Sequence, residues 1–341
     1  MADAWHPSQG LERDLYGHSA AKTLIDGAIA RRRLHHAILL TGPCGIGKAT
    51  FAWRLAARLL AEDGEDVAAT SRLLLAGTHP DFACLEADGN GPGRAGTKDI
   101  GVDAVRGILR RFAHASGRPR RVAILDPVDA LNTNAANALL KTLEEPPAGV
   151  VWLLVSHVPG RLPATIRSRA LHVRLAPLDD DDTRRAIAEL GLGDIPATDL
   201  ETLLHLADGR PGRALALAGD DDLGDVEAFA ALLEAPANAV SGAQLLAIAD
   251  RIGKRGNDHA FSAMLDVWAT HLAKTVKDAR AGDVDPAVLA ELAGLWDKAG
   301  RQIRDTTIFN LDRARLAEFL IEARPVVGRQ NDCPADRDPR H

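Results

Sequence analysis

The chain has 341 residues and a formal net charge of −6, with 26% charged residues, which argues against a protein that binds nucleic acid over its whole surface. Its three cysteines lie far apart, which excludes a disulfide framework and a paired-cysteine metal site and is typical of a reducing cytosol. Its N-terminus has no apolar signal core, and no stretch approaches the roughly 18 apolar residues of a membrane span, so we expect a cytoplasmic protein without membrane contact.

Five short apolar runs predict the strands of a parallel sheet. The first four are nearly continuous hydrophobic runs, as expected for parallel strands that are covered on both faces. Helical periodicity lies between the runs, which indicates a three-layer α/β domain. The expected strands are residues 37–41, 82–86, 122–126, 150–156 and 171–175.

Helix signals separate these runs. We expect one helix from a cap at Ser19 through Arg33, and an amphipathic helix over residues 49–61. Asn132 or Asn134 is expected to cap a further helix that a pair of prolines ends. Beyond the fifth run the strand patterns disappear, which predicts a C-terminal half built of helices.

Residues 42–48 read Gly-Pro-Cys-Gly-Ile-Gly-Lys, which is the Gly-x-x-x-x-Gly-Lys spacing of a phosphate-binding loop. Gly42, Gly45 and Gly47 allow backbone N–H groups to turn toward an anion, and Lys48 reaches the outer phosphates. A strand is expected before this loop and a helix after it, which strengthens the prediction of a nucleotide site. The alternative is a glycine-rich turn that binds nothing.

Two positions argue against hydrolysis at this loop. Ala49 stands where the hydroxyl of Ser or Thr normally binds magnesium, and Thr50 points about 100° away on a helix. Asp126 ends an apolar run, where an aspartate can hold a magnesium-bound water, but Pro127 replaces the glutamate that would polarise the attacking water. We therefore expect ATP or ADP to be bound without hydrolysis. The alternative role of Asp126 is to cap a local turn.

Residues 134–147 (NAANALLKTLEEPP) closely resemble the signature helix of the AAA+ clamp-loader family. The resemblance covers residues 15–325 and is most specific to the delta-prime branch of the bacterial DNA polymerase III clamp loader, in its alphaproteobacterial form. Further segments match the family in order, namely Tyr16-Gly17-His18, Leu34-His35-His36-Ala37, His79-Pro80-Asp81, Ile124-Leu125-Asp126, Val155-Ser156-His157, Ile166-Arg167-Ser168-Arg169-Ala170, Gly209 to Leu215, and Asn310-Leu311-Asp312.

The resemblance implies a domain organisation. An AAA+ P-loop domain with a parallel sheet is expected at residues 1–177, a helical lid at 178–222, an all-α collar domain for oligomerisation at 223–328 and a disordered tail at 329–341. Other members carry a four-cysteine zinc module, but only Cys84 lies between residues 45 and 120 here. No zinc or other metal is therefore expected.

The resemblance also implies partners and a function. The chain is expected to join gamma/tau and delta subunits in a hetero-pentamer that loads the β sliding clamp onto primed DNA, and to act there as a stator with weak or absent ATPase activity. The alternative is a hydrolysing gamma/tau-like motor. Such a motor would need Ser or Thr at position 49 and Glu at position 127, where this chain has Ala49 and Pro127.

Three further site residues follow from the resemblance. Arg169 is expected to act as an arginine finger in the ATP site of a neighbouring subunit, Ser156 as sensor 1 and Arg213 as sensor 2. The alternatives are a surface ion pair for Arg169, a role that Arg167 fits better, a turn cap for Ser156 and a lid salt bridge for Arg213. A basic cluster is expected to meet DNA phosphates or an acidic partner, or to form a solvated face; it comprises Arg106, Arg110, Arg111, Arg118, Arg120 and Arg121.

Overall fold

The computed structural model describes residues 6–61, 66–87, 99–113, 119–192, 195–218, 223–236, 241–254, 258–281, 286–309 and 311–323. Its contacts divide the chain into two units. Unit 1 comprises Met1–Ala197 with Ala207–Leu215, and unit 2 comprises Thr198–Leu206 with Ala216–His341.

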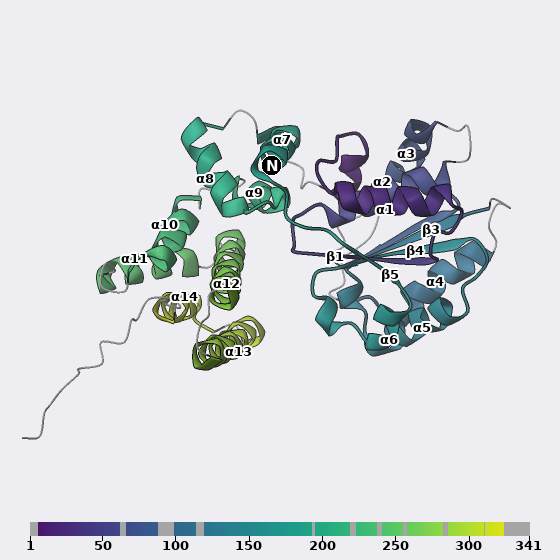
Figure 1. Cartoon of the computed structure of the whole chain (residues 1–341). Coiled ribbons are helices and arrows are strands. Elements are labelled where there is room, and N and C mark those ends of the chain that lie inside the picture. The colour runs from purple at the N-terminus through teal and green to yellow at the C-terminus, as the bar shows by residue number, and fades with distance from the viewer. Residues whose placement is uncertain are drawn as a thin grey trace, which may run out of the picture. The chain divides into compact units, whose positions relative to one another are not determined.

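Unit 1 is built on a five-stranded parallel sheet in the order β2-β3-β4-β1-β5 (Figure 1). The five predicted strands are confirmed, although the third begins one residue earlier and the fifth ends one residue earlier than expected. The strands are β1 (Ala37–Thr41), β2 (Phe82–Glu86), β3 (Arg121–Asp126), β4 (Val150–Ser156) and β5 (Leu171–Arg174).

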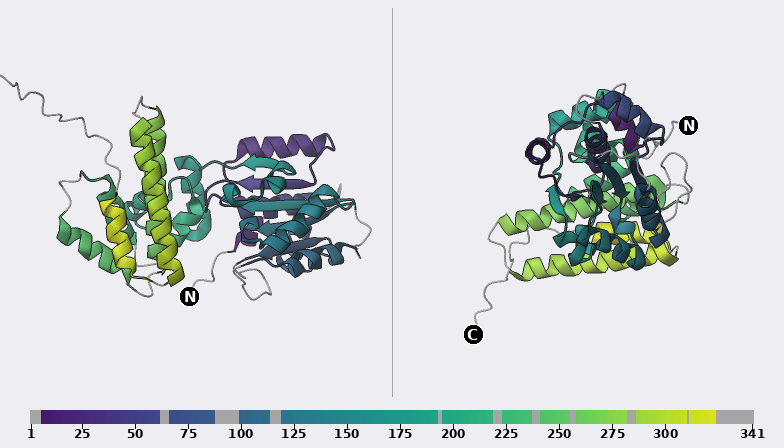
Figure 2. Two further views of the ribbon diagram at one scale, coloured as in Figure 1. Left: turned by 90° about the horizontal axis from the view of Figure 1, so that it is seen from below. Right: turned by 90° about the vertical axis from the view of Figure 1, so that its right-hand side faces the viewer.

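Helices cover both faces of this sheet, which gives the predicted three-layer α/β architecture (Figures 1 and 2). The helices on one face are α1 (Ser19–Ala30), α2 (Lys48–Leu60) and α3 (Val67–Leu75), and those on the other are α4 (Val102–Ala113), α5 (Thr133–Glu144) and α6 (Ala164–Ser168). Further helical segments of unit 1 are η1 (Pro7–Leu11), η2 (Val128–Ala130), η3 (Pro159–Arg161), α7 (Asp180–Ile187) and η4 (Ala188–Leu192).

Alternate residues of each strand enter different cores. In β1, Ile38 and Leu40 pack with α1 and α2, whereas Ala37 and Leu39 pack with α4 and α5. All four are completely buried. The continuous apolar pattern of the central strands therefore arises because both faces are covered, since side chains alternate between the faces of a sheet.

The helix boundaries correct one prediction and confirm another. Ser19 is the first residue of α1 and not its cap; His18 occupies the cap position with a left-handed backbone and makes no capping hydrogen bond. The helix ends at Ala30, before the expected Arg33. Asn132 caps α5 as predicted, because its side-chain oxygen accepts a hydrogen bond from the N–H of Ala135 at 2.9 Å.

In unit 2 the structure describes only helices, as predicted for the C-terminal region. The helices are α8 (Ala197–Ala207), α10 (Leu223–Glu234), α11 (Gly242–Gly253), α12 (Asp258–Ala281), α13 (Pro286–Phe309) and α14 (Arg313–Glu322); α9 (Pro211–Ala218) begins in unit 1. The long helices α12 and α13 run side by side (Figure 2). Buried Trp268 joins three helices, because its indole N–H donates to the Leu320 carbonyl at 3.0 Å and its ring stacks on Trp296.

Three predictions concern residues outside the described ranges, namely the tail at 329–341, Asn310 of the Asn310-Leu311-Asp312 segment and Arg118 of the basic cluster. Of the helices that the structure describes, none combines the length and the apolar character needed to cross a membrane.

Candidate nucleotide-binding site

The glycine-rich loop connects the end of β1 to the first residue of α2, Lys48. Gly42, Gly45 and Gly47 all have positive φ angles, of 148°, 81° and 94°. Residues with a Cβ rarely adopt these backbone conformations, so each of these positions favours glycine. The loop therefore has the strand-turn-helix context and the backbone freedom of a phosphate-binding loop.

Lys48 is directed at its own loop. Its ammonium group donates hydrogen bonds to the carbonyl oxygens of Gly42 at 2.9 Å and Pro43 at 2.7 Å, and the residue is only 2% exposed. Burial lowers the pKa of Lys48, and Coulombic interactions with Cys44, Asp126 and Asp129 act in the opposite direction. In this arrangement the lysine stabilises the loop itself.

The opposite side of the loop contacts the first turn of α9. The backbone N–H of Gly212 donates to the carbonyl oxygen of Gly45 at 2.9 Å. There is no room for side chains at this contact, because a Cβ on Gly212 would lie 2.9 Å from Cα of Gly45. The N-terminal end of α9 therefore takes a carbonyl group of the loop as its partner.

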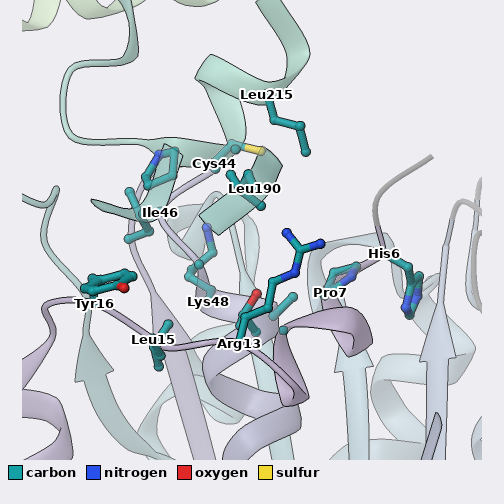
Figure 3. Close-up of a pocket in the computed structure, with 18 of the residues that line it drawn as sticks. His6, Pro7, Arg13, Leu15, Tyr16, Cys44, Ile46, Lys48, Leu190 and Leu215 are labelled. Atoms are coloured by element: carbon teal, nitrogen blue, oxygen red, sulfur yellow. The ribbon is translucent and has the colours of Figure 1, made fainter. Parts of the chain in front are cut away.

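A cavity of about 310 Å³ adjoins the loop (Figure 3). The predicted site residues Gly45, Gly47, Lys48 and Asp126 line it, whereas Gly42, Ser156 and Arg213 do not. Most of its wall is apolar and comes from five parts of unit 1: the N-terminal segment, the loop with the start of α2, the residue after β3, the α7–η4 region with the segment before it, and α9. The apolar residues are Pro7, Leu15, Ile46, Ala49, Pro127, Leu178, Ala186, Leu190, Pro211 and Leu215.

Glu189 of η4 lines this cavity and makes two contacts with the N-terminal segment. The guanidinium group of Arg13 donates to the backbone carbonyl of Glu189, and the hydroxyl of Tyr16 donates to its carboxylate at 3.4 Å. Arg13 and Tyr16 lie at the wall of the cavity in Figure 3. No local sequence signal indicated these contacts, because the partners are far apart in the chain.

A second group at the cavity ties the N-terminal segment to the sheet. Nδ1 of His6 accepts from the N–H of Ser8 at 3.2 Å, so Nε2 carries hydrogen and donates to the Glu86 carboxylate at 2.9 Å. Glu86 lies opposite Asp126 in the register of β2 and β3. The carboxylate beside Asp126 is therefore held by His6, and this pair was not predicted from the sequence.

The carboxylate of Asp129 organises the chain after β4. It accepts hydrogen bonds from the Ser156 hydroxyl at 2.8 Å and from the N–H groups of His157 at 2.6 Å and Val158 at 3.1 Å. Ser156 is completely buried. In this structure the Ser156 hydroxyl stabilises a turn, which agrees with the alternative role of a turn cap. The sensor 1 role of Ser156 stays a prediction.

Arg169 lies at the C-terminal end of α6 and is partly exposed. Its guanidinium group pairs with the Glu144 carboxylate at 2.9 Å and donates to the Thr165 carbonyl at 3.2 Å. The expectation that Arg167 fits a surface ion pair better than Arg169 is wrong. Arg169 makes that pair, and Nε of Arg167 is buried without a hydrogen-bond partner in the part of the chain that the structure describes.

Arg213 and the basic cluster also occupy defined positions. Arg213 is buried in the first turn of α9. Within the cluster, Arg111 donates to the His79 carbonyl at 2.8 Å and Arg121 to the Phe112 carbonyl at 2.9 Å, so both serve local structure. Arg118 lies outside the described residues. The sensor role of Arg213 and a nucleic-acid role of the cluster stay predictions.

The loop fits a phosphate group better than it fits a magnesium ion. Its glycines and Lys48 are the residues that cradle phosphates, but the metal-binding hydroxyl is missing at Ala49. Thr50 does not supply it, because its methyl group packs against Gly10, where an added Cβ would lie 2.3 Å from Thr50 Cγ2. Over the ranges that the structure describes, no group of three or more His, Cys, Asp or Glu residues is arranged to hold a metal.

Comparison with known proteins adds an independent line of evidence. Residues 17–179 match the protein family described as "DNA polymerase III, delta subunit". The delta-prime subunit of DNA polymerase III from Pseudomonas aeruginosa is 42% identical over 192 residues, which cover 54% of this chain and 56% of that protein. Its counterpart from Escherichia coli is 35% identical over 197 residues, with 56% of each chain covered.

These matches support a clamp-loader subunit of DNA polymerase III, the family that residues 17–179 match. The chain is also 29% identical to the tau subunit of Salmonella typhimurium over 332 residues, which cover 94% of this chain and 48% of that protein. The chain spans about half the length of the curated relatives that it matches.

Solved structures resemble this chain only weakly. A gamma subunit-related protein of DNA polymerase III from Thermotoga maritima has a TM-score of 0.43 and 17% identity, and covers 89% of this chain and 99% of that one. The Holliday junction branch migration motor RuvB from the same organism has a TM-score of 0.42 and 18% identity, with 82% of each chain covered.

Proposed function

We propose that this chain is the delta-prime stator subunit of a bacterial DNA polymerase III clamp loader. It would not hydrolyse ATP itself but would donate Arg169 to the ATP site of a neighbouring subunit. Its partners would be gamma/tau and delta subunits in a hetero-pentamer, and through that complex the β clamp and primed DNA. It would work at the replisome in the cytoplasm, with a lid at residues 178–222 and a collar at 223–328.

The observation that carries the non-hydrolysing role is the state of the glycine-rich loop. The ammonium group of Lys48 is hydrogen-bonded to the carbonyls of Gly42 and Pro43. Ala49 and Pro127 occupy the positions of the metal hydroxyl and the general base, so both catalytic groups are missing from one site. Two of the nearby acidic side chains, Asp129 and Glu86, are hydrogen-bonded to other groups.

The environment of Arg169 supports its role in a neighbouring site. The side chains of Arg169 and Glu144 are 38% and 45% exposed, so their ion pair is formed at the surface. Surface ion pairs contribute only about 0–1 kcal/mol. A γ-phosphate of a neighbouring subunit carries more negative charge than one carboxylate and accepts two guanidinium N–H groups. The exchange of Glu144 for such a phosphate would therefore be favourable.

Reconstitution with gamma/tau and delta subunits tests this proposal. Arg169→Ala should lower the ATPase rate of the assembled loader by about 10-fold or more at the affected site, since arginine fingers generally contribute 10³–10⁵. Arg161→Ala removes an exposed charge from a nearby segment and is the matched control. Glu144→Ala should leave the rate unchanged or raise it. An unchanged rate for Arg169→Ala in a fully assembled complex would refute the trans role.

A hydrolysing gamma/tau-like motor is the second candidate function, because the similarity to the tau subunit covers 94% of this chain. That function would require turnover by the purified chain alone. DNA-stimulated ATP hydrolysis by the isolated chain, lost in Lys48→Ala, would establish the motor and overturn the stator proposal. Nucleotide binding without turnover, or no binding, agrees with the stator.

A further inference from the structure

A second cavity lies at the edge of the sheet opposite the glycine-rich loop. The loop follows the C-terminal end of β1, whereas this cavity is lined by residues at or just before the starts of β1, β3 and β4. Its volume is about 680 Å³. None of its lining residues is acidic; they are Arg32, Leu34, His36, Leu59, Leu60, Ala61, Pro119, Arg120, Gly149, Val150 and Val151.

Arg32 occupies a backbone position that favours glycine. Its φ is 52°, in the left-handed region, directly after the C-cap of α1. The N–H groups of Arg32 and Arg33 bond back to the carbonyls of Ile29 and Ala28, each at 2.9 Å, as in the common glycine-ended helix terminus. An arginine in this backbone conformation is less stable than a glycine would be. A function of the Arg32 side chain would explain why arginine is present here.

Arg120 supplies the second guanidinium group, from the segment that leads into β3. It is half-buried, whereas Arg32 is exposed, and among the described residues neither Arg120 nor Arg32 makes a side-chain hydrogen bond or an ion pair. Among the described residues that line it, the cavity thus has two cationic groups and no acidic one. Two like charges that share one cavity repel each other, so an anion between them would be stabilising.

The wall beside Arg120 is closely packed backbone. Gly149 has a φ of 75°, and a Cβ added to it would lie 2.4 Å from the carbonyl oxygen of Pro119. The segment that carries Arg120 is therefore held against the start of β4, where the N–H of Arg121 also donates to the Gly149 carbonyl at 2.8 Å. This packing fixes the backbone from which the Arg120 side chain extends.

His36 lines the cavity but does not add to its charge at neutral pH. Its Nε2 hydrogen is donated to the carbonyl oxygen of Leu143 at 3.0 Å. Burial, with the neighbouring His35 as a smaller cause, lowers the pKa of His36. The positive charge of the cavity therefore comes from the two arginines.

We propose that this cavity binds phosphate groups between Arg32 and Arg120. The planar guanidinium fork matches the oxygens of phosphate with two parallel hydrogen bonds, and arginine is the preferred residue for such recognition. The ligand chemistry is that of a phosphodiester backbone or a free polyphosphate. This site is separate from the glycine-rich loop and does not depend on the function proposed above.

The test uses the full chain and two probes. A fluorescein-labelled oligothymidylate of about 20 nucleotides reports phosphodiester binding by anisotropy, and inorganic tripolyphosphate reports free polyphosphate by calorimetry. Arg32→Gly and Arg120→Gln should each weaken binding of the active probe about 5- to 10-fold, and each should reduce the slope of log affinity against log salt by about 1. The probe that binds identifies the source of the phosphate.

Matched variants separate a loss of binding from a loss of folding and from a general loss of charge. Arg32→Gly removes the left-handed arginine, so its Tm should stay equal to that of the wild type or rise, and lost binding cannot then be assigned to unfolding. Arg33→Gly removes the same charge from the exposed neighbour outside the cavity and should change affinity less than 2-fold. Arg32→Gly and Arg120→Gln should weaken probe binding by the same factor in the wild type and in a Lys48→Ala background, which separates this cavity from the glycine-rich loop.

Three results would overturn the assignment. The first is no salt-dependent binding of either probe, and the second is an equal loss in Arg33→Gly, which would mean a diffuse charge effect. The third concerns the acidic residues Glu62, Asp63 and Glu65, which follow Ala61 in the sequence. Binding seen only after these three are replaced by Gln, Asn and Gln would show that the native chain does not present this site.

Discussion

Gly45 of the glycine-rich loop and Gly212 of α9 meet backbone to backbone. The N–H of Gly212 donates to the carbonyl oxygen of Gly45 at 2.9 Å, and neither position has room for a side chain. Because the two glycines are far apart in the chain, they do not belong to one turn, and their contact is a tertiary one. The contact joins the loop that would bind phosphates to the region that follows the parallel sheet.

Gly212→Ala tests the closeness of this contact. The new Cβ would lie 2.9 Å from Cα and 3.1 Å from the oxygen of Gly45, and backbone atoms cannot move aside as a flexible side chain can. Overpacking of this kind should lower the free energy of unfolding by about 1–3 kcal/mol, measured by urea denaturation. Gly107→Ala in α4 has open space around it and should instead stabilise by about 0.5–1 kcal/mol. Equal effects in both variants would contradict the close contact.

Lys48→Ala separates the structural role of this lysine from a catalytic one. The variant loses the hydrogen bonds to the Gly42 and Pro43 carbonyls, so the free energy of unfolding should fall by about 1–3 kcal/mol. The ATPase rate of the reconstituted loader should change little, because hydrolysis would occur in other subunits. A large loss of loader turnover by a complex that still assembles would mean that this pocket is active.

Asp129→Asn should destabilise the turn after β4. The carboxylate accepts three hydrogen bonds, from the Ser156 hydroxyl and from the N–H groups of His157 and Val158. The amide N–H₂ group of asparagine would replace one accepting oxygen and would lie against a hydrogen-bond donor. This should lower the free energy of unfolding by about 1.5–3 kcal/mol. Ser156→Ala removes only one of the three bonds and should cost about 1 kcal/mol. If Ser156→Ala proved the more damaging, the carboxylate would not be the centre of this turn.

The stability of the chain should depend on pH through His18. Its Nε2 lies 2.8 Å from the Ile46 carbonyl in the glycine-rich loop, and burial lowers its pKa in the folded chain. The unfolded chain therefore binds the proton more readily. The resulting contribution to stability is present above about pH 6.5 and is lost as the pH falls below that value toward the lower folded pKa.

His18→Gln removes this titration. The free energy of unfolding, measured by denaturant titration between about pH 5 and pH 8, should fall less steeply toward acid in the variant than in the wild type. Parallel curves would show that His18 does not titrate differently in the two states. Since burial also lowers the pKa of His36, the variant should keep part of the acid sensitivity of the wild type.

Much of the fold could be predicted because its signals are local. The strands of the sheet are short apolar runs that depend only on neighbouring residues, and the cap at Asn132 depends on a hydrogen bond to a residue three positions away. The end of α1 could not be predicted in the same way. Helical composition continues to Arg33, but the chain turns at Arg32 into a left-handed conformation that arginine rarely adopts.

The sequence by itself determined the glycine-rich loop, the lack of a metal hydroxyl at Ala49 and the lack of a base at Pro127, because those features depend on the residue types present. Only the tertiary structure decided that His6 holds Glu86, that Asp129 takes the hydroxyl of Ser156, and that Arg32 and Arg120 share one cavity. Each of these pairs joins segments that are distant along the chain. Their meeting depends on the strand order β2-β3-β4-β1-β5 and on the packing of two helical layers, which no local pattern of residues specifies.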